Sequence, residues 1–416
     1  MSKNTEVKVN PSKLQLVSAT VEMEEDYWLF ENLKDVPYGR LPLSNLSAKG
    51  GPTTLKNYQR VASYNWYLED QFRPTIVSPG NPREFVFWNG GRLPADRGVL
   101  VYDVNHLKLN GGPMDPAILC TKMQAENSKK PDVNFQEFDF ITDSLNLQKI
   151  FAFCKADAEG LFRIDLERVG NTVIMNRVES SDLMEINFET FDNHLKAITS
   201  KGQSPETAGP YYTMASYTFG QFKFLVRFES DCADYTKLPG YEPPDPEMDE
   251  KKEEKKSDAP APEPERIPFF DAADYTLSYI EHGNFTKHHN LLNVVSYPHN
   301  RGFPLFTWAQ LFFSGADGVV VGYYKGANDF NRPATNTLQD LNKLMKPLPY
   351  AVLSKVHDCL GKIVNFMKAN DEDLKIALVW KGVEQLEIFE KAADSPSAVS
   401  DHVKAMLRMQ VAQQNS

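Results

Sequence analysis

The sequence predicts a mixed α/β protein of the α+β kind, in which a central mixed β-sheet is flanked by helices. Apolar runs typical of buried strands alternate with segments of helical spacing along the whole chain, and no internal repeat is found. Hydrophobic residues make up 41% of the 416 residues and charged residues 24%, which is typical of a globular protein. A chain of this length can bury a large core between layers of strands and helices.

We expect one domain with an irregular beginning and one long insert. Residues 1–55 carry few periodic signals, and residues 56–416 read as a single domain. Inside that domain, the segment 236–266 is acidic and rich in proline: residues 241–266 hold ten acids, five bases and six prolines. Such a segment has too few apolar side chains to pack into a core, so the sequence predicts a disordered insert.

The first half of the domain predicts a strand, a helix and a hairpin in that order. Residues 138–142 are strand-like, and apolar residues at 147–151 recur at helical spacing, with Asp143 or Ser144 as the expected helix cap. Two β-type runs, at 161–166 and 172–175, flank Val169-Gly170-Asn171, which is the pattern of a hairpin. A short helix is then expected from about Leu183 to Lys196.

The second half of the domain continues the alternation of strands and helices. The run at 291–296 is largely apolar, so we expect it to lie in the centre of a sheet. The other expected elements are strands at 222–228, about 274–280 and 318–324, helices at 304–313, 350–369 and 397–412, and a hairpin near 381–382.

An acidic pair closes the strand expected at 222–228. Glu229 and Asp231 are two residues apart, so on a strand their side chains point to the same face, about 7 Å from each other. Two carboxylates so placed repel each other unless a cation lies between them or one is protonated. The pair is therefore a candidate ligand set for Mg²⁺ or Mn²⁺, and a solvated strand end is the alternative.

Charge, cysteines and motifs argue against several classes of protein. A net charge of −11 disfavours a protein that coats nucleic acid, so an RNA contact would need a local polar channel. The four cysteines lack C-x-x-C spacing, which disfavours a zinc site and fits the nucleus or cytoplasm. We expect no secretory signal and no membrane span. The sequence has no G-x-G-x-x-G or P-loop motif, which argues against an enzyme with a nucleotide cofactor. It also has no DDxxD cluster, which argues against prenyl transfer.

Four stretches resemble, in their order and spacing, the DXO-type family of decapping exoribonucleases, which have PD-(D/E)xK-like cores. They span about residues 135–325 and read Phe-Ile-Thr-Asp-Ser-Leu-Asn-Leu-Gln-Lys-Ile (140–150), Ile-Asn-Phe-Glu (186–189), Phe-Glu-Ser-Asp (228–231) and Trp-Ala-Gln-Leu-Phe-Phe-Ser-Gly (308–315) followed by Val-Val-Val-Gly-Tyr. The resemblance implies a hydrolase that acts on RNA 5′ ends with Mg²⁺ or Mn²⁺.

The resemblance also implies roles for particular side chains. Glu189, Glu229 and Asp231 would be the catalytic carboxylates, and together with Asn293 they would ligate the metal. Gln310 would contact the RNA backbone, and Lys149 is a further candidate for RNA binding.

The chain departs from that family at three positions. Asn293 and Val295 stand where the family has the glutamate and lysine of Glu-h-Lys, and Ser144 stands where an arginine contacts the RNA 5′ end. The loss of one such preorganised group typically costs about 10²–10³ in rate. A replacement cation would come from Lys149, Lys287, Arg301, His282, His288 or His289.

Two hypotheses about function follow from these residues. The retained carboxylates favour an RNA 5′-end hydrolase. The lost lysine and arginine favour a pseudoenzyme, a catalytically degenerate nuclease fold that binds RNA ends or a protein partner. Such a partner would dock on the insert at 236–266 or on the final helix.

Overall fold

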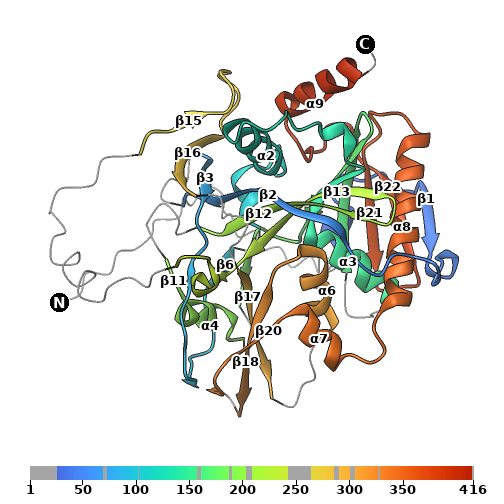
Figure 1. The fold of residues 1–416 in the computed structure, drawn as a ribbon. Helices are drawn as coiled ribbons and strands as arrows, with labels where there is room; N and C mark the ends of the chain where they lie inside the picture. Colours follow the sequence, from blue (N-terminus) through green and yellow to red (C-terminus); the bar gives the residue numbers. More distant parts are fainter. Residues whose placement is uncertain are drawn as a thin grey trace, which may run out of the picture.

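The computed structural model describes residues 26–68, 73–101, 103–156, 161–186, 190–202, 209–241, 264–284, 290–299, 305–326 and 328–414. Two large β-sheets and the helices around them make up this part of the chain (Figure 1). The predicted α+β class with mixed sheets is therefore confirmed. Most of the acidic insert, residues 242–263, lies outside the described residues.

The larger sheet has twelve strands, and the units predicted from the sequence form its centre. β7 (Phe140–Asp143) runs parallel to both β13 (Phe222–Ser230) and β9 (Thr172–Val178). β8 (Leu161–Val169) and β9 form the predicted hairpin. The sheet continues on one side through β21 (Ile376–Lys381), β22 (Gln385–Glu390) and β1 (Gly39–Pro42), and on the other through β12 (Tyr211–Phe219), β2 (Lys56–Trp66), β3 (Thr75–Gly80), β16 (Ser278–Gly283) and β15 (Ile267–Pro268).

The smaller sheet has eight strands, and the apolar strand expected to be central lies in its interior. β17 (Leu291–Pro298) pairs in parallel with β18 (Gly318–Lys325) on one side and antiparallel with β14 (Cys232–Ala233) on the other. The remaining strands are β11 (Ser200–Lys201), β4 (Glu84–Phe85), β19 (Asp329–Phe330), β5 (Gly91–Arg92) and β20 (Ala334–Asn336). A separate pair is formed by β6 (Val99–Val101) and β10 (Leu183–Glu185).

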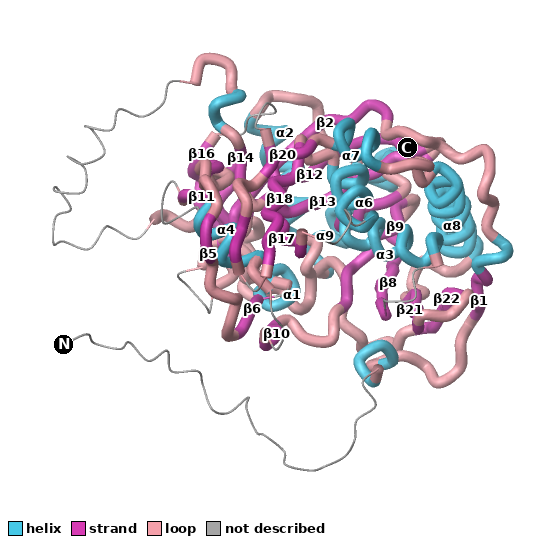
Figure 2. The backbone as a smooth tube through the Cα atoms, turned by 90° about the horizontal axis from the view of Figure 1, so that it is seen from below, coloured by secondary structure: helices cyan, strands magenta, loops and turns pink. Residues whose placement is uncertain are grey.

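Helices cover both faces of the larger sheet. The apolar sides of α3 (Ser144–Lys155), α6 (Leu305–Ser314) and α8 (Tyr350–Ala369) share one core with this sheet, and Figure 2 shows the three helices grouped together. α2 (Asp115–Asn127) and the final helix α9 (Asp401–Gln414) pack into a second core on the other face. The shorter helices are α1 (Val104–Lys108), α4 (Asp192–Thr199) and α7 (Leu338–Leu344).

The prediction of a helix from about Leu183 to Lys196 is wrong for the first half of that segment. Leu183 and Glu185 belong to β10, where they lie opposite Val101 and Val99 of β6. Pairing with a distant strand therefore overrides the helical spacing of this segment, as tertiary context often does. The helix that does form, α4, begins only at Asp192.

Among the described residues, no helix is both long and apolar enough to cross a membrane. The four cysteines are buried and form no disulfide with one another. The sequence-based placement in the nucleus or cytoplasm stays a prediction.

Asp115, the first residue of α2, is a buried carboxylic acid that contacts the start of α9. Only 1% of its surface is exposed. Its Oδ1 accepts a hydrogen bond from the backbone N–H of Ser400, and its Oδ2 accepts one from the hydroxyl of Tyr275, each at 3.0 Å. Burial raises the pKa of Asp115 to about 6, although the hydrogen bonds from Ser400 and Tyr275 act in the opposite direction.

The stability of the protein should therefore depend on the charge of Asp115. Because its pKa is higher in the folded than in the unfolded chain, stability falls as the pH rises from about 4 to about 6. The variant Asp115→Asn keeps an acceptor for Ser400 but carries no charge. We expect its free energy of unfolding to exceed that of the wild type by about 1–3 kcal/mol at pH 8 and to equal it at pH 4. Unfolding curves at the two pH values measure this, and a difference independent of pH would contradict it.

Candidate functional site

A pocket lies where the chain passes from one sheet to the other. β13 of the larger sheet ends at Ser230, and β14 of the smaller sheet begins at Cys232. Between them, the backbone N–H of Asp231 donates to the oxygen of Leu292 at 3.1 Å, and its Oδ2 accepts from the N–H of Val294 at 2.7 Å. These bonds fix the acidic pair at the junction of the two sheets, beside a cavity of about 220 Å³.

Four of the side chains singled out in the sequence meet in this pocket. Glu229 comes from the end of β13, Asp231 from the link to β14, Asn293 from β17 and Gln310 from α6. The end of β13 and the more distant segment that contains β17 and α6 thus bring these groups to one cavity, although their roles stay predictions.

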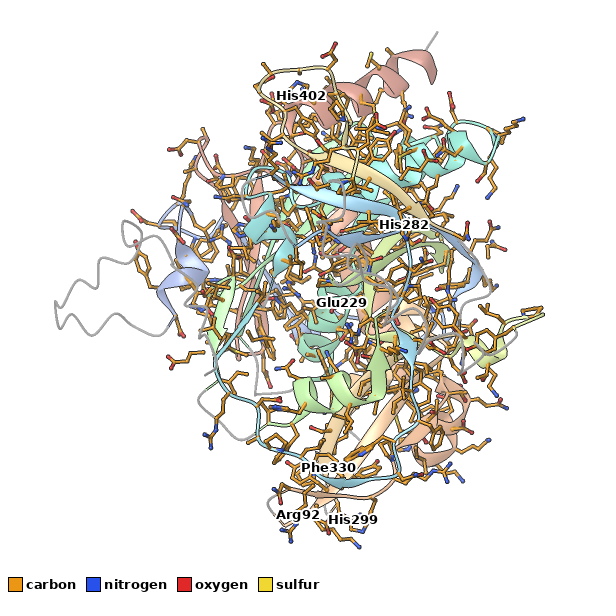
Figure 3. The ribbon with its side chains drawn as sticks, turned by 90° about the vertical axis from the view of Figure 1, so that its left-hand side faces the viewer. Arg92, Glu229, His282, His299, Phe330 and His402 are labelled. Atoms are coloured by element: carbon orange, nitrogen blue, oxygen red, sulfur yellow. The ribbon has the colours of Figure 1, made fainter. Side chains whose placement is uncertain are left out.

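The remaining candidates for metal ligand, RNA contact or replacement cation do not line the pocket or are not described. Lys149 pairs with Glu179 at 2.7 Å and does not line the pocket. His282 lies on β16, away from Glu229 (Figure 3). Outside the described residues lie Glu189, Lys287, His288, His289 and Arg301.

Lys196 is a pocket cation that the sequence pattern does not reveal. In the first turn of α4, Oδ1 of Asp192 accepts hydrogen bonds from the backbone N–H and the hydroxyl of Ser296, at 2.7 and 2.6 Å. These bonds tie α4 to β17, and Leu195 is buried in the core beneath the helix. The next residue, Lys196, therefore points its ammonium at Asp231, and its Nζ lies 2.8 Å from Oδ1.

The surroundings of Lys196 keep it charged. Desolvation would lower the pKa of its ammonium, but the carboxylates of Asp231 and Glu229 outweigh that effect, and the pKa is raised above its ordinary value. An amine that stays protonated at neutral pH cannot act as a base. Lys196 can instead supply a positive charge and hydrogen-bond donors.

Among the described residues, Glu229 has fewer polar partners than Asp231, which binds both Lys196 and the N–H of Val294. Its carboxylate accepts a hydrogen bond from the hydroxyl of Tyr212 at 3.1 Å. Desolvation in the pocket and the nearby charge of Asp231 raise the pKa of Glu229, whereas Lys196 and Tyr212 oppose the shift. A further cation beside Glu229 would therefore be stabilising.

The side chain of Asn293 gives a second indication that the pocket is suited to a bound cation or hydrogen-bond donor. Its side chain is 5% exposed, and within the described ranges its Oδ1 accepts no hydrogen bond. An unsatisfied buried acceptor typically costs about 1–3 kcal/mol, which a bound cation or donor would offset. The oxygens of Asn293, Glu229 and Asp231 are the type of ligand that Mg²⁺ and Mn²⁺ prefer.

These residues fit a divalent cation, although they do not complete its shell. In the described part of the chain, no three His, Cys, Asp or Glu side chains gather closely enough to hold a metal ion. A full set of ligands would therefore need Glu189, water or substrate oxygens in addition. Lys196 competes for the same ion because it already pairs with Asp231.

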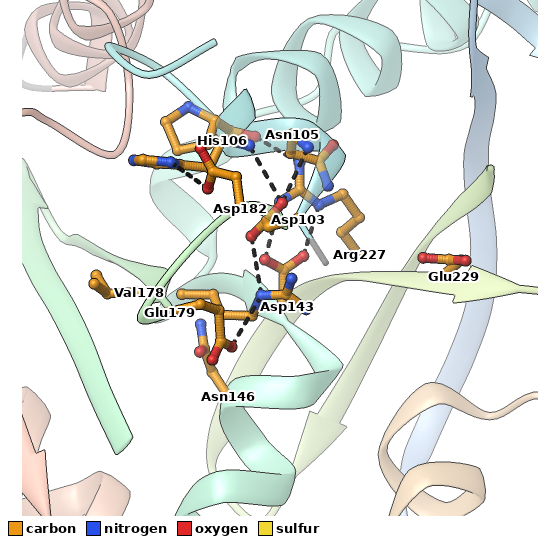
Figure 4. Close-up of polar contacts among 12 residues, drawn as sticks. Asp103, Asn105, His106, Asp143, Asn146, Val178, Glu179, Asp182, Arg227 and Glu229 are labelled. Carbon is orange, nitrogen blue, oxygen red and sulfur yellow. Dashed lines mark hydrogen bonds and ion pairs between the residues drawn. The ribbon is translucent and has the colours of Figure 1, made fainter. Parts of the chain in front are cut away.

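A network of ion pairs forms another wall of the pocket (Figure 4). The guanidinium of Arg227 donates to both oxygens of Asp143, at 2.6 and 2.9 Å, and to the carbonyl of Pro113 at 2.6 Å. Arg177 pairs with Asp103 at 2.9 Å. Asp143 stands at the expected cap position of α3, but its carboxylate binds Arg227 instead of capping the helix.

The described lining of the pocket carries four carboxylates and three cations. Each of the three cations, Arg177, Lys196 and Arg227, lies within ion-pair distance of a carboxylate. Glu229 stands apart from the network of Figure 4. The excess of one acid makes the pocket more favourable for a cation than for a free anion.

The comparisons with known proteins place this chain in a family. A model described as "Domain of unknown function (DUF8563)" matches residues 48–261. The chain belongs to this family. No curated protein matches the sequence.

The fold of this DUF8563 protein is similar to crystal structures of Rai1 from three fungi. Rai1 from S. pombe is 12% identical, with a TM-score of 0.53 over 85% of this chain and 99% of that chain. Rai1 from Scheffersomyces stipitis is 12% identical, with a TM-score of 0.53 over 90% and 99%. Rai1 from Candida albicans, in complex with pU5 and Mn²⁺, is 11% identical, with a TM-score of 0.53 over 89% and 99%. These likenesses confirm the predicted DXO-type fold.

The sequence-based reasoning did not identify the cations of the DUF8563 protein's pocket, Arg177, Lys196 and Arg227. Arg227 and Lys196 line the cavity, but neither was among the candidates proposed from the sequence as a replacement cation. Arg227 precedes Glu229 by two residues, so the period of a strand could have placed both side chains on one face. For Lys196 the only signal was its spacing of four from Asp192 on a helix.

Proposed function

We propose that this pocket binds the 5′ end of an RNA chain and hydrolyses a phosphoester or pyrophosphate bond there. The observation that carries the proposal is the convergence of Glu229, Asp231 and Asn293 on one cavity at the junction of two sheets. The fold shared with Rai1 supports it, because one Rai1 structure is a complex with pU5 and Mn²⁺.

The residues of the pocket would divide the chemistry among them. Glu189, Glu229, Asp231 and Asn293 would hold Mg²⁺ or Mn²⁺, which when bound supplies positive charge at the scissile phosphate and an activated water. Gln310 would donate a hydrogen bond to the RNA backbone.

Lys196 would take over the task of the lysine that Val295 replaces. Its ammonium lies beside Asp231 and stays protonated, so it would stabilise the negative charge that develops on the phosphate oxygens. The charge would thus come from α4 instead of from β17.

The second candidate function is a pocket that binds RNA ends without cleaving them. One observation favours it: both oxygens of Asp231 are already engaged, by Lys196 and by the N–H of Val294. In that case the insert at 236–266 or the final helix would serve to dock a protein partner, in the nucleus or cytoplasm.

A cleavage assay separates the two candidates. The purified protein is incubated with 5′-triphosphate, NAD-capped and 5′-monophosphate RNAs in Mg²⁺ and in Mn²⁺. We expect at least one RNA to be cleaved, and chelation of the metal to stop the cleavage. The control variant Asp373→Asn, which removes a carboxylate that is 95% exposed and outside the pocket lining, should cleave like the wild type. Binding of the RNAs without any cleavage would contradict the hydrolase and support the second candidate.

A further inference from the structure

Phe306 is an exposed aromatic ring at the edge of the candidate site. It belongs to α6 and lines the same pocket as Glu229 and Asp231, yet 47% of its surface is open to solvent. The helix is otherwise strongly buried: Trp308 and Phe312 lie in the core against the larger sheet. A single exposed ring is ordinary on a protein surface, so the position of Phe306 beside a polar pocket is what makes it informative.

The ring stands next to side chains that can read a nucleobase. Gln310 lies four residues further along α6, so it shares the helix face with Phe306, and it lines the pocket as well. Three more amides, of Asn105, Gln148 and Asn293, contribute to the same wall. Amides carry both donors and acceptors, which match the edges of bases.

Two of these amides differ in the hydrogen bonds that their oxygens accept. Oδ1 of Asn105 accepts hydrogen bonds from the hydroxyl of Tyr64 at 2.8 Å and from Nε1 of Trp66 at 2.9 Å, so this amide is held in one orientation. Oδ1 of Asn293 is buried and has no donor among the described residues. The wall of the pocket thus combines a fixed amide with an acceptor that still needs a partner.

We propose that Phe306 is a stacking platform for the base of the 5′-terminal nucleotide of the RNA. The base would lie on the ring beside Gln310, while its phosphate faces Glu229 and Asp231. This inference rests on the proposed function, because it requires that an RNA end enters the pocket. Every base has a flat aromatic face, so the platform would accept any of the four. It would select single-stranded ends, because a paired terminal base must first leave its partner.

A binding experiment with two RNAs tests the platform. One is a 5′-phosphorylated oligonucleotide of five residues, and the other is identical but lacks the base of its first nucleotide. Dissociation constants are measured by fluorescence anisotropy in Ca²⁺ for the wild type, Phe306→Ala and Phe306→Tyr. We expect Phe306→Ala to weaken binding of the complete RNA about 5–100-fold and to leave binding of the abasic RNA unchanged. Phe306→Tyr, which keeps a ring, should bind both RNAs like the wild type.

The possible failures of this experiment are distinguishable. If Phe306→Ala weakens both RNAs equally, or neither, the stacking platform is overturned while the proposed RNA binding stands. If the wild type binds neither RNA, the proposed function fails, and the platform fails with it. Thermal unfolding of each variant serves as the control for folding, and the exposure of Phe306 predicts unchanged midpoints.

Discussion

Replacing Asp231 by asparagine is expected to lower the rate of RNA cleavage at least about 10²–10³-fold. The asparagine oxygen can still accept the hydrogen bond from Val294, so the junction between the sheets should keep its shape. The substitution removes the negative charge that pairs with Lys196 and that would help to hold the divalent cation. The loss should therefore appear in the chemical step more than in RNA affinity.

Single-turnover cleavage in Mn²⁺, together with RNA binding by anisotropy, measures both quantities for Asp231→Asn. Asp373→Asn is the matched control, because it makes the same chemical change at an exposed site outside the pocket lining. A cleavage rate equal to that of the control would contradict the assignment of Asp231.

Replacing Lys196 by methionine is expected to have the second largest effect, a fall in cleavage rate of about 10²–10³-fold at similar RNA affinity. Methionine keeps an unbranched side chain, while Asp192 and Leu195 continue to anchor α4. The variant therefore removes the ammonium and little else. The single-turnover rate at saturating RNA is the quantity to compare.

A rescue variant makes the test of Lys196 specific. Val295 follows Asn293 by two residues on β17, so both side chains lie on the same face of the strand. Adding Val295→Lys to the Lys196→Met protein would return a positive charge to this face, and we expect it to restore part of the lost rate. If Lys196→Met cleaves faster than the wild type, or binds Mn²⁺ more tightly without a loss of rate, Lys196 competes with the metal for Asp231 and does not supply the catalytic charge.

Those parts of the fold that depend on local pattern were predictable from the sequence. The helix at 350–369 has an apolar stripe that packs on the larger sheet, and α8 has the same bounds. The Gly170-Asn171 turn closes the β8–β9 hairpin as expected. The acidic pair was likewise predictable, because it stands at the end of a long apolar strand.

The remaining features depend on contacts between segments that are distant in the sequence. β10 forms because residues 183–185 meet β6, and that contact delays the start of α4 to Asp192. The direction of the Lys196 side chain then follows from the bond between Asp192 and Ser296, which are 104 residues apart. Arg227 binds Asp143 across 84 residues. No window of local sequence contains both partners of either contact.

We infer that Glu229, Asp231 and Asn293 hold one divalent cation between the two sheets. A crystal soaked in Mn²⁺ and measured at a wavelength where manganese scatters anomalously would reveal this ion. We expect an anomalous peak about 2.0–2.6 Å from oxygens of Glu229, Asp231 and Asn293, with the ammonium of Lys196 displaced from Oδ1 of Asp231 or sharing that carboxylate with the ion. A pocket without a peak, in which Lys196 still pairs with Asp231 at saturating Mn²⁺, would contradict it.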